Sequence, residues 1–434
     1  MLVSITVKNW LSFRDEATLS LRASRERTHV ETLHPLPKKY GTGKILPIAA
    51  VYGQNASGKT ALFEAMQLMQ RLVISSPDPD DLTGSIPFLL DPDSREAPTE
   101  LSAEVLLGER IFRYSLSLKP EGILEESLME TLAKTNFTLF RRSDDLLGGD
   151  LDSDLNRAIM DNLPANQTFL NAAVKLGSEQ LRPIYDWFAK SLKLVGLEAS
   201  YREYSQMMVR EDFREFAGDI LRKYAGIDGI GLQPVEEGDV KNRLRSIVAK
   251  HSKKVDSGFT GIHHVISRSS RNVSYYFIQV EDGKVTDISR MAMRHRMPDG
   301  STVNFDVESE SAGTQRLVDL MPAFFDLDSS EDGQDNVYFI DEIDQSFHTA
   351  MTHDLVKRFL DSCTHESRKQ LVFNLHDLSL MDSPILRKDE LWVCDKDNDV
   401  GTSSLKNIGR YTGMRSDTNI LKAYKTNVFG GYPG

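Results

Sequence analysis

Residues 53–60 read Gly53-Gln54-Asn55-Ala56-Ser57-Gly58-Lys59-Thr60, which is the pattern of a loop that binds nucleotide phosphates. Its glycines let backbone N–H groups turn towards the phosphates, and Lys59 adds a positive charge beside them. Thr60 would place its hydroxyl on the Mg²⁺ ion that bridges the β- and γ-phosphates. We therefore expect ATP and Mg²⁺ to bind, with nucleotide contacts at Gly53, Asn55, Ala56, Ser57, Gly58, Lys59 and Thr60.

The flanks of this loop have the context that the pattern requires. Residues 45–52 form a largely apolar run, which is typical of a buried strand. After Thr60, apolar residues recur at helical spacing, at Leu62, Ala65, Met66, Met69, Leu72 and Val73. The sequence predicts a strand, a loop and a helix whose N-terminus faces the phosphates.

A second apolar run, Val337 to Ile340, ends in Asp341 and Glu342. It predicts a buried strand that delivers two carboxylates at its C-terminal end, where ligands lie in open α/β sheets. Asp341 is the expected Mg²⁺ partner, and Glu342 is positioned to polarise the attacking water. Two acids at the end of a strand are common, and an ordinary polar strand end is the alternative. The phosphate loop upstream favours the roles at Mg²⁺ and water.

The stretch Ser311-Ala312-Gly313-Thr314-Gln315-Arg316 resembles the signature motif of ABC-type ATPases, a family that includes SMC, RecF and OLD-like proteins. The resemblance implies that Ser311 and Gly313 contact the γ-phosphate held by a second, facing subunit. The residues alone favour a simpler alternative, a capped start of a helix over residues 315–325. If the resemblance holds, a complete site needs two chains.

His376 follows the apolar run Leu371 to Phe373 and precedes Asp377. This position suits a switch histidine, which contacts the γ-phosphate in ABC-type sites, although an ordinary histidine at the edge of the core is the alternative. Relatives often carry threonine before this histidine, and here the residue is Leu375.

Both ends of the chain strengthen the resemblance. Residues 1–15, with Asn9-Trp10-Leu11-Ser12-Phe13, look like the first strand and turn of RecF- and OLD-like ATPases. In those proteins the turn lies beside the adenine, which implies base contacts at Phe13 and Arg14. Residues 385–392 and 424–434 resemble the tail of stand-alone bacterial ATPases of the OLD-like "AAA" group, which serve in anti-phage defence systems such as PARIS.

Composition excludes several classes of protein. The 434 residues are 40% hydrophobic, without a run of 18 apolar residues, and charge appears early in the chain. We therefore expect a cytoplasmic protein without a membrane segment. Two cysteines, Cys363 and Cys394, allow neither a disulfide framework nor a zinc cluster. A net charge of −12 argues against a protein that coats DNA.

Basic residues nevertheless gather in the middle of the chain, at Lys241, Arg243, Arg245, Lys250, Lys253 and Lys254. The segment Lys241–Lys254 could contact nucleic acid or an acidic protein, and a solvated helix face is the alternative.

The predicted fold class is α/β: an ABC-type ATPase head, with a mixed sheet around the phosphate loop, an antiparallel sheet and an inserted, mainly helical lobe. Residues 1–150 would form the N-terminal half of the head, with a hairpin around Gly108 and Glu109. Residues 151–258 would form the helical lobe. Residues 259–434 would complete the head with the signature, the two acids and His376.

Three functions remain open from the sequence. The resemblance favours an ATPase that dimerises around ATP and holds a separately encoded effector nuclease until a phage product acts as trigger. A RecF-like DNA-repair ATPase that works through Lys241–Lys254 is the first alternative. The second is a nucleotide-gated scaffold in which hydrolysis is dispensable. A classical AAA+ ring is the rival at the level of the fold.

Overall fold

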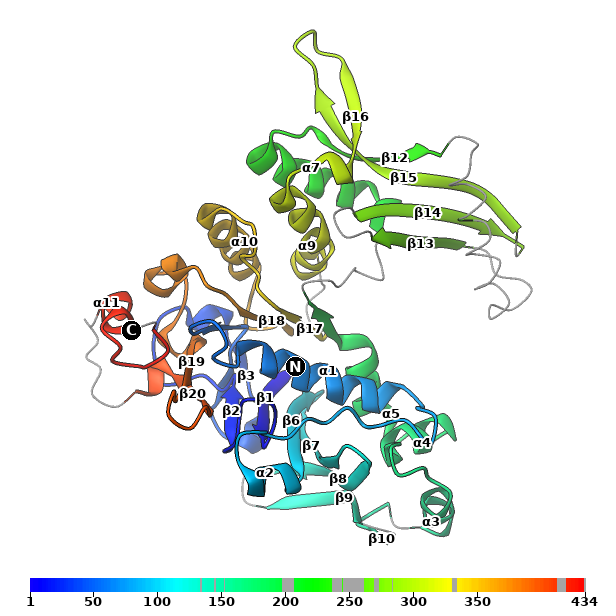
Figure 1. Ribbon diagram of the computed structural model, residues 1–434, viewed down its shortest axis with the longest axis vertical. Coiled ribbons are helices and arrows are strands. Elements are labelled where there is room, and N and C mark those ends of the chain that lie inside the picture. Colours follow the sequence, from blue (N-terminus) through cyan, green and yellow to red (C-terminus); the bar gives the residue numbers. More distant parts are fainter. Residues whose placement is uncertain are drawn as a thin grey trace. The chain divides into compact units, whose positions relative to one another are not determined.

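The computed structural model describes residues 1–132, 135–143, 146–151, 153–196, 207–235, 244, 261–268, 273–282, 284–329, 334–411 and 419–432. The chain divides into two compact units. The first comprises Met1–Leu197, Ser330–Asp344 and His353–Gly434, and the second comprises Glu198–Ser329 and Gln345–Thr352. Figure 1 shows the elements of each unit.

A six-stranded sheet in the first unit carries the predicted nucleotide motifs. Its order is β11-β17-β18-β5-β19-β20, and all neighbours are parallel except the pair β19 and β20. Because β17, β18 and β5 run in the same direction, their C-terminal ends meet at one edge. The strands are β5 (Ile48–Tyr52), β11 (Leu192–Val195), β17 (Asn336–Ile340), β18 (Lys369–Asn374), β19 (Leu391–Lys396) and β20 (Ser403–Asn407).

The second sheet of this unit is antiparallel and has seven strands in the order β10-β9-β8-β7-β6-β1-β2. The expected hairpin is present, since β6 and β7 pair on either side of Gly108, whose φ of 55° is favourable for glycine. The strands are β1 (Leu2–Lys8), β2 (Ala17–Ser20), β6 (Thr99–Leu107), β7 (Arg110–Lys119), β8 (Gly122–Thr131), β9 (Asn136–Ser143) and β10 (Leu146–Gly148); a separate pair joins β3 (His34–Pro35) and β4 (Lys44–Ile45).

Helix α1 (Lys59–Ile74) packs into a core shared by these two sheets. Its apolar positions Leu62, Met66 and Met69 are buried, as their spacing predicts. Each such side chain contributes about 1.5–3 kcal/mol when fully buried, which fixes the phosphate loop against the sheet. The other helices of the unit are α2 (Pro92–Glu96), α3 (Asp154–Asp161), α4 (Phe169–Lys175), α5 (Arg182–Asp186), a π-helical turn (Trp187–Ser191) and α11 (Ile420–Lys425).

Among its described residues, the second unit contains a five-stranded antiparallel sheet and the helices α7 and α9. Its order is β12-β15-β14-β13, with β16 also paired to β15. Helices α7 and α9 meet through Phe213 and Phe216, whose rings lie 5.2 and 5.4 Å from that of Phe325. The elements are β12 (Gly229–Pro234), β13 (Gly261–Arg268), β14 (Val273–Glu281), β15 (Lys284–Arg296), β16 (Thr302–Asp306), α7 (Glu211–Ala225) and α9 (Ala312–Ser329); α10 (Thr349–Asp361) begins in this unit and ends in the first.

The inserted unit differs from the predicted helical lobe over residues 151–258. Residues 151–196 belong to the first unit, and the inserted unit extends to Ser329. Its sheet forms because β12 pairs with β15 across about sixty positions of sequence, for example Gly229 with Arg294. Such long-range pairing leaves no local signal at β12. Residues 192–195, which lie in the range of the predicted helical lobe, form the edge strand β11 beside β17.

Candidate nucleotide site

The phosphate loop lies between β5 and α1 in the conformation that its sequence predicts. Ala56 and Gly58 have φ angles of 60° and 102°. A Cβ atom on Gly58 would lie 2.5 Å from the Ser12 hydroxyl, so a side chain is excluded there. The ammonium of Lys59 donates hydrogen bonds to the carbonyls of Gly53 (2.8 Å) and Gln54 (3.1 Å), and burial lowers the pKa of Lys59.

The N-terminus of α1 fits an anion. Its N-cap, Gly58, provides no side-chain hydrogen bond, and its first turn carries no acidic residue. The first backbone N–H groups of a helix have no partner inside the helix, and the helix dipole favours negative charge beside them. The buried hydroxyls of Ser12 and Ser57 also have no hydrogen-bond partner among the described residues. These donors suit the phosphates of a nucleotide.

Thr60 and Asp341 meet at the corner where Mg²⁺ is expected. The Thr60 hydroxyl donates to the Asp341 carboxylate over 3.3 Å, and Asp341 is 4% exposed. Within the described ranges, no group of three or more His, Cys, Asp or Glu side chains could hold a metal by itself. One hydroxyl and one carboxylate fit Mg²⁺, which is usually bound through few protein ligands together with substrate phosphates and water.

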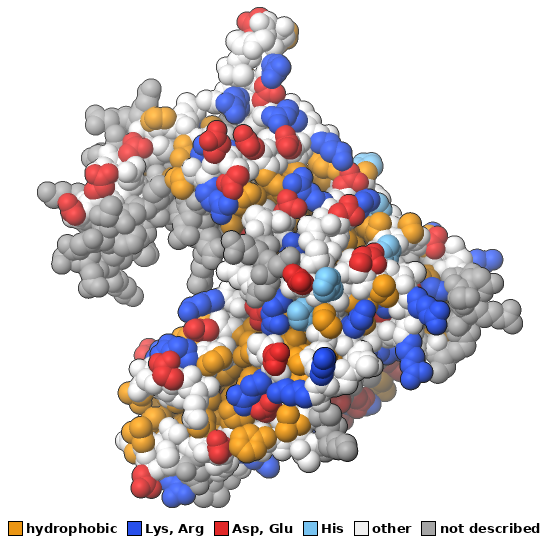
Figure 2. All heavy atoms as spheres, turned by 180° about the vertical axis from the view of Figure 1, so that it is seen from behind, with side chains coloured by type: hydrophobic (Ala, Val, Ile, Leu, Met, Phe, Trp, Pro, Cys, Tyr) orange, Lys and Arg blue, Asp and Glu red, His pale blue; other side chains and the backbone are white. Residues whose placement is uncertain are grey.

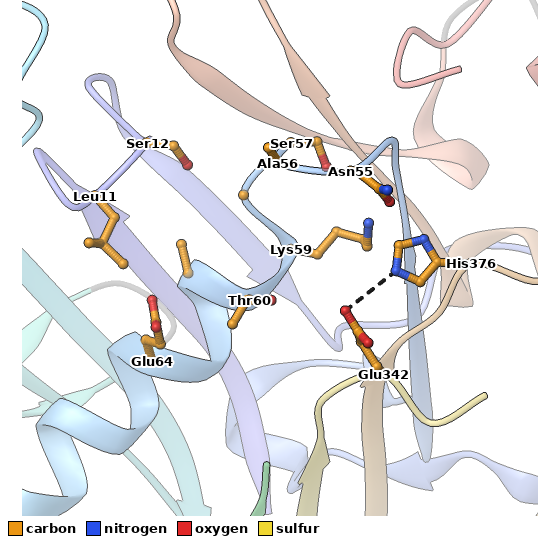
Figure 3. A pocket seen from close by; sticks show the side chains of 12 residues that line it. Leu11, Ser12, Asn55, Ala56, Ser57, Lys59, Thr60, Glu64, Glu342 and His376 are labelled. Carbon is orange, nitrogen blue, oxygen red and sulfur yellow. Dashed lines mark ion pairs between the residues drawn. The ribbon is translucent and has the colours of Figure 1, made fainter. Parts of the chain in front are cut away.

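Glu342 and His376 lie side by side at one side of the pocket (Figure 3), with 3.5 Å between the Glu342 carboxylate and Nε2 of His376. Both side chains reach solvent, at 28% and 43% exposure. Glu342 has a φ angle of 47°, a left-handed conformation that is unfavourable for a non-glycine residue. Strain of this kind persists where the surrounding structure enforces it, often at functional sites.

Asn374, at the end of β18, enforces this arrangement, and the sequence analysis did not identify it. Its amide donates to Asp341 and its side-chain oxygen accepts from the Glu342 backbone N–H over 2.7 Å. Asp344 adds a second link, since its carboxylate accepts from the backbone N–H groups of His376 (2.9 Å) and Asp377 (2.7 Å). A polar residue at the end of a third parallel strand was the available sequence signal.

The phosphate loop, Glu342 and His376 line one cavity of about 560 Å³ in the first unit. This volume is within the range of roughly 300–1,000 Å³ that is usual for small-molecule sites. Figure 3 shows Leu11, Ser12 and Glu64 on one side of it, while Glu342 and His376 lie on the other side of Lys59. The lining residues are Leu11, Ser12, Asn55, Ala56, Ser57, Gly58, Lys59, Thr60, Ala61, Glu64, Glu342 and His376.

The turn that begins at Asn9 contributes Leu11 and Ser12 to the lining of this cavity, and not the expected Phe13 and Arg14. Phe13 is fully buried because it pairs with Trp10 at the base of the turn, and its ring belongs to the core. Arg14 points away from the lining and forms an ion pair with Asp15 at 3.0 Å. Leu11 and Ser12 are therefore the residues of this turn that line the cavity, whereas the expected base contacts Phe13 and Arg14 are not among its lining residues.

Asn9 explains why this turn is rigid. Its side chain donates to the carbonyls of Ser94 and Ala97 and accepts from the Phe88 N–H, while its backbone carbonyl accepts from Thr99. The Trp10 indole also donates to the Ala61 carbonyl in the first turn of α1, over 2.7 Å. The turn is thereby tied to the phosphate-binding helix.

Ser311 and Gly313 lie in the second unit, at the start of α9. The Ser311 hydroxyl accepts a hydrogen bond from the Thr314 N–H over 3.2 Å, which is the helix cap that the residues alone favour. A Cβ atom on Gly313 would lie 2.5 Å from the Ser346 carbonyl. Packing inside the second unit therefore accounts for a glycine at this position.

The predicted basic segment Lys241–Lys254 lies outside the described residues, apart from Leu244, which packs beside Ile278 and Ile288. Nearby basic residues of the sheet are paired, since Arg290 contacts Asp306 at 2.8 Å and Arg296 contacts Asp228 at 2.9 Å. On the face shown in Figure 2, the coloured basic and acidic side chains are interspersed.

A phosphate loop after a parallel strand, with two acids and a polar residue at the ends of two further strands, defines a P-loop nucleotide-binding protein. Residues 48–382 match the family described as "AAA domain, putative AbiEii toxin, Type IV TA system". The chain belongs to this family.

Similar solved structures include an SMC head domain from Thermotoga maritima, at 12% identity and a TM-score of 0.37, covering 94% of this chain and 98% of that one. An SMC head bound to the C-terminal winged-helix domain of ScpA is 13% identical with a TM-score of 0.38, and covers 93% and 97% of the two chains. No curated protein matches. Among the described residues, no helix could span a membrane.

Proposed function

We propose that this protein is a Mg²⁺-dependent ATPase. The observation that carries the proposal is the convergence of Lys59, Thr60, Glu342 and His376 on one cavity, with Asp341 behind Thr60. Asn55, Ala56, Ser57 and the backbone of Gly53 and Gly58 would cradle the phosphates. Mg²⁺, held by Thr60 and Asp341, would neutralise phosphate charge.

Glu342 would act as the general base. Its carboxylate takes a proton from a water molecule whose oxygen attacks the γ-phosphorus, and the bond between the γ-phosphorus and the bridging oxygen breaks to give ADP and phosphate. His376 is placed to contact the γ-phosphate, and Asn374 and Asp344 hold these two residues in position. The proton then passes from Glu342 to solvent.

We further propose that hydrolysis controls an assembly of two chains, in which Ser311 and Gly313 complete the site of the facing subunit. In this scheme ATP supplies contacts that exist only in the closed dimer, so its hydrolysis shifts the dimer towards opening. The family description, which refers to a toxin and a toxin–antitoxin system, supports a defence sensor that holds a separately encoded effector nuclease and responds to a phage trigger.

Mixing two inactive variants tests the composite site. Lys59→Ala removes the phosphate contact and Ser311→Arg blocks the facing surface, so each variant alone should release little phosphate from ATP. An equal mixture should recover roughly a quarter of the unmodified rate, because half of randomly paired two-fold dimers would hold one intact site of two. If both single variants are inactive and their mixture recovers nothing, the shared site is disproved.

Three further measurements test the wider role. Co-expression with a nuclease encoded beside this protein should give a complex that purifies together and releases the nuclease when the trigger is present. DNA binding that weakens with salt and disappears on charge reversal across Lys241–Lys254 would instead favour DNA repair. A cellular phenotype that persists in Glu342→Gln would show that hydrolysis is dispensable.

A further inference from the structure

Apolar side chains gather on the surface of the segment between α1 and α2, which Figure 1 shows as an extended trace. Leu82, Ile86, Leu89 and Leu90 are 64, 45, 53 and 67% exposed. Leu90 abuts Gly401, and the adjacent Val400 is 46% exposed. Single exposed apolar residues are normal, but four of them within the nine residues 82–90, with Val400 next to the Gly401 that Leu90 abuts, make an elongated apolar surface of the kind that marks an interaction site. We call these five residues the apolar strip.

Hydrogen bonds hold the backbone of this segment in place. The Thr83 N–H donates to the Pro120 carbonyl over 2.9 Å, and the Phe88 N–H donates to the Asn9 side chain over 3.0 Å. Thr83, Ser85 and Phe88 are buried beneath the strip. The exposed leucines therefore extend from a backbone that is held in place by hydrogen bonds to other parts of the first unit.

The charge around the apolar strip is acidic. Residues 77–96 contain one basic residue, Arg95, and six acidic residues: Asp78, Asp80, Asp81, Asp91, Asp93 and Glu96. The Arg95 guanidinium donates a hydrogen bond to the Leu89 carbonyl over 2.6 Å. Arg71 also donates to the Thr83 carbonyl within the segment, so the excess of acidic residues lies at its two ends, residues 78–81 and 91–96. Acidic ends of this kind disfavour nucleic acid and anionic lipid surfaces and favour lysine and arginine.

We propose that the apolar strip is a docking surface for a partner polypeptide that carries apolar side chains flanked by lysine or arginine. The apolar residues of the partner would cover the leucines, while its basic residues would face the acids on both sides. This function is additional to nucleotide hydrolysis. The strip adjoins the nucleotide cavity, because the N–H of Leu11, a lining residue, donates to the Ile86 carbonyl over 2.9 Å.

A synthetic peptide of alternating leucine and lysine pairs serves as a defined probe, and its affinity for the full chain is measured by fluorescence anisotropy at physiological salt. A peptide with serine in place of leucine reports purely electrostatic binding. We expect the leucine peptide to bind at least tenfold more tightly than the serine peptide. Leu82→Ser/Leu90→Ser should abolish this difference, and Asp80→Asn/Asp93→Asn should weaken binding about threefold.

The matched control is Leu155→Ser/Val428→Ser, which changes two exposed apolar residues outside the strip (72 and 47% exposed). It should bind the leucine peptide as the unmodified chain does. All variants should keep the melting temperature and the ATP affinity of the unmodified protein, which separates this proposal from the nucleotide site.

Equal binding by the unmodified chain and Leu82→Ser/Leu90→Ser overturns the proposal, as does an equal loss in the control variant. Analytical ultracentrifugation measures whether the chain associates with a second copy of itself through the strip. If the unmodified chain self-associates and Leu82→Ser/Leu90→Ser does not, the strip contacts a second copy of this chain, and the proposal of a basic partner is wrong.

Discussion

Two clusters of charged residues in the first unit look alike in the sequence and differ in the structure. One is the cavity edge formed by Asp341, Glu342 and His376, where Glu342 and His376 remain open to solvent. The other is the ion pair of Arg387 and Asp389, whose side chains are 0 and 1% exposed. The candidate site thus has two solvent-accessible side chains beside the buried Asp341, whereas both side chains of the Arg387–Asp389 pair are buried.

The side chains of Arg387 and Asp389 form their hydrogen bonds with each other and with nearby backbone groups. The Arg387 guanidinium donates to both Asp389 oxygens, at 2.9 and 2.8 Å, and to the carbonyls of Glu26 and Thr28. Although burial opposes the charge, the hydrogen bonds and charge of Asp389 raise the pKa of Arg387. Asp389 also accepts from the Ser24 N–H over 2.6 Å. The cluster joins residues 24–28 to the start of β19.

The largest effect is therefore expected from Arg387→Met. Removing one partner of a buried ion pair leaves the other charge unpaired and costs about 3–5 kcal/mol of unfolding free energy. Urea denaturation measures this loss. Arg387→Met/Asp389→Leu should recover part of it, because the Asp389 carboxylate is removed together with its partner, while the buried Glu390 remains beside the site. A single variant that is as stable as the unmodified protein would contradict the structural role of the pair.

At the cavity edge, Glu342→Gln should leave the unfolding free energy within about 0.5 kcal/mol of the unmodified value, as is usual for solvent-accessible positions. The amide cannot take a proton from water, so kcat should fall by about 10²–10⁴-fold. Phosphate release measures the rate, and retained ATP binding shows that the site is intact. The matched control is Glu100→Gln, an exposed acid paired with Lys8, which should keep full activity.

Asn374→Ala tests a residue that shares a feature with each cluster, because Asn374 is buried and also contacts residues of the candidate site. The loss of its hydrogen bonds should cost about 1–3 kcal/mol of unfolding free energy. Activity should fall about 10–100-fold, as is typical for residues that orient others at a metal site. If the unfolding free energy falls while kcat is unchanged, Asn374 does not position Glu342 or Asp341.

Local patterns were sufficient to predict the strand, loop and helix around Lys59, and also the strand that ends at Asp341. Each depends on the spacing of neighbouring residues and on burial of a single face. The partnership of Asn374 with Asp341 and Glu342 was not predictable in this way, because it depends on β18 lying beside β17. Strand order is a property of the whole sheet.

The inserted unit illustrates the same limit. Strand β14 (Val273–Glu281) lies in the range 259–434 that was predicted to complete the ATPase head. The pairing of β12 with β15 places this sheet in a separate unit. At Phe13, the family resemblance implied a base contact, whereas the turn buries this ring in the core and leaves Leu11, whose φ angle is 51°, partly buried in the cavity lining.

The smallest expected effect concerns this turn. Leu11 lines the cavity, so Leu11→Ala should remove an apolar contact worth about 1 kcal/mol and raise KM for ATP about fivefold with kcat unchanged. Arg14→Ala is the matched control, since an exposed pair such as Arg14 and Asp15 contributes about 0–1 kcal/mol and lies outside the lining. Its KM should stay within about twofold of the unmodified value. A larger change in KM for Arg14→Ala than for Leu11→Ala would favour Arg14 as the residue beside the base. In that case the residues that line the cavity are not the ones that contact the bound nucleotide.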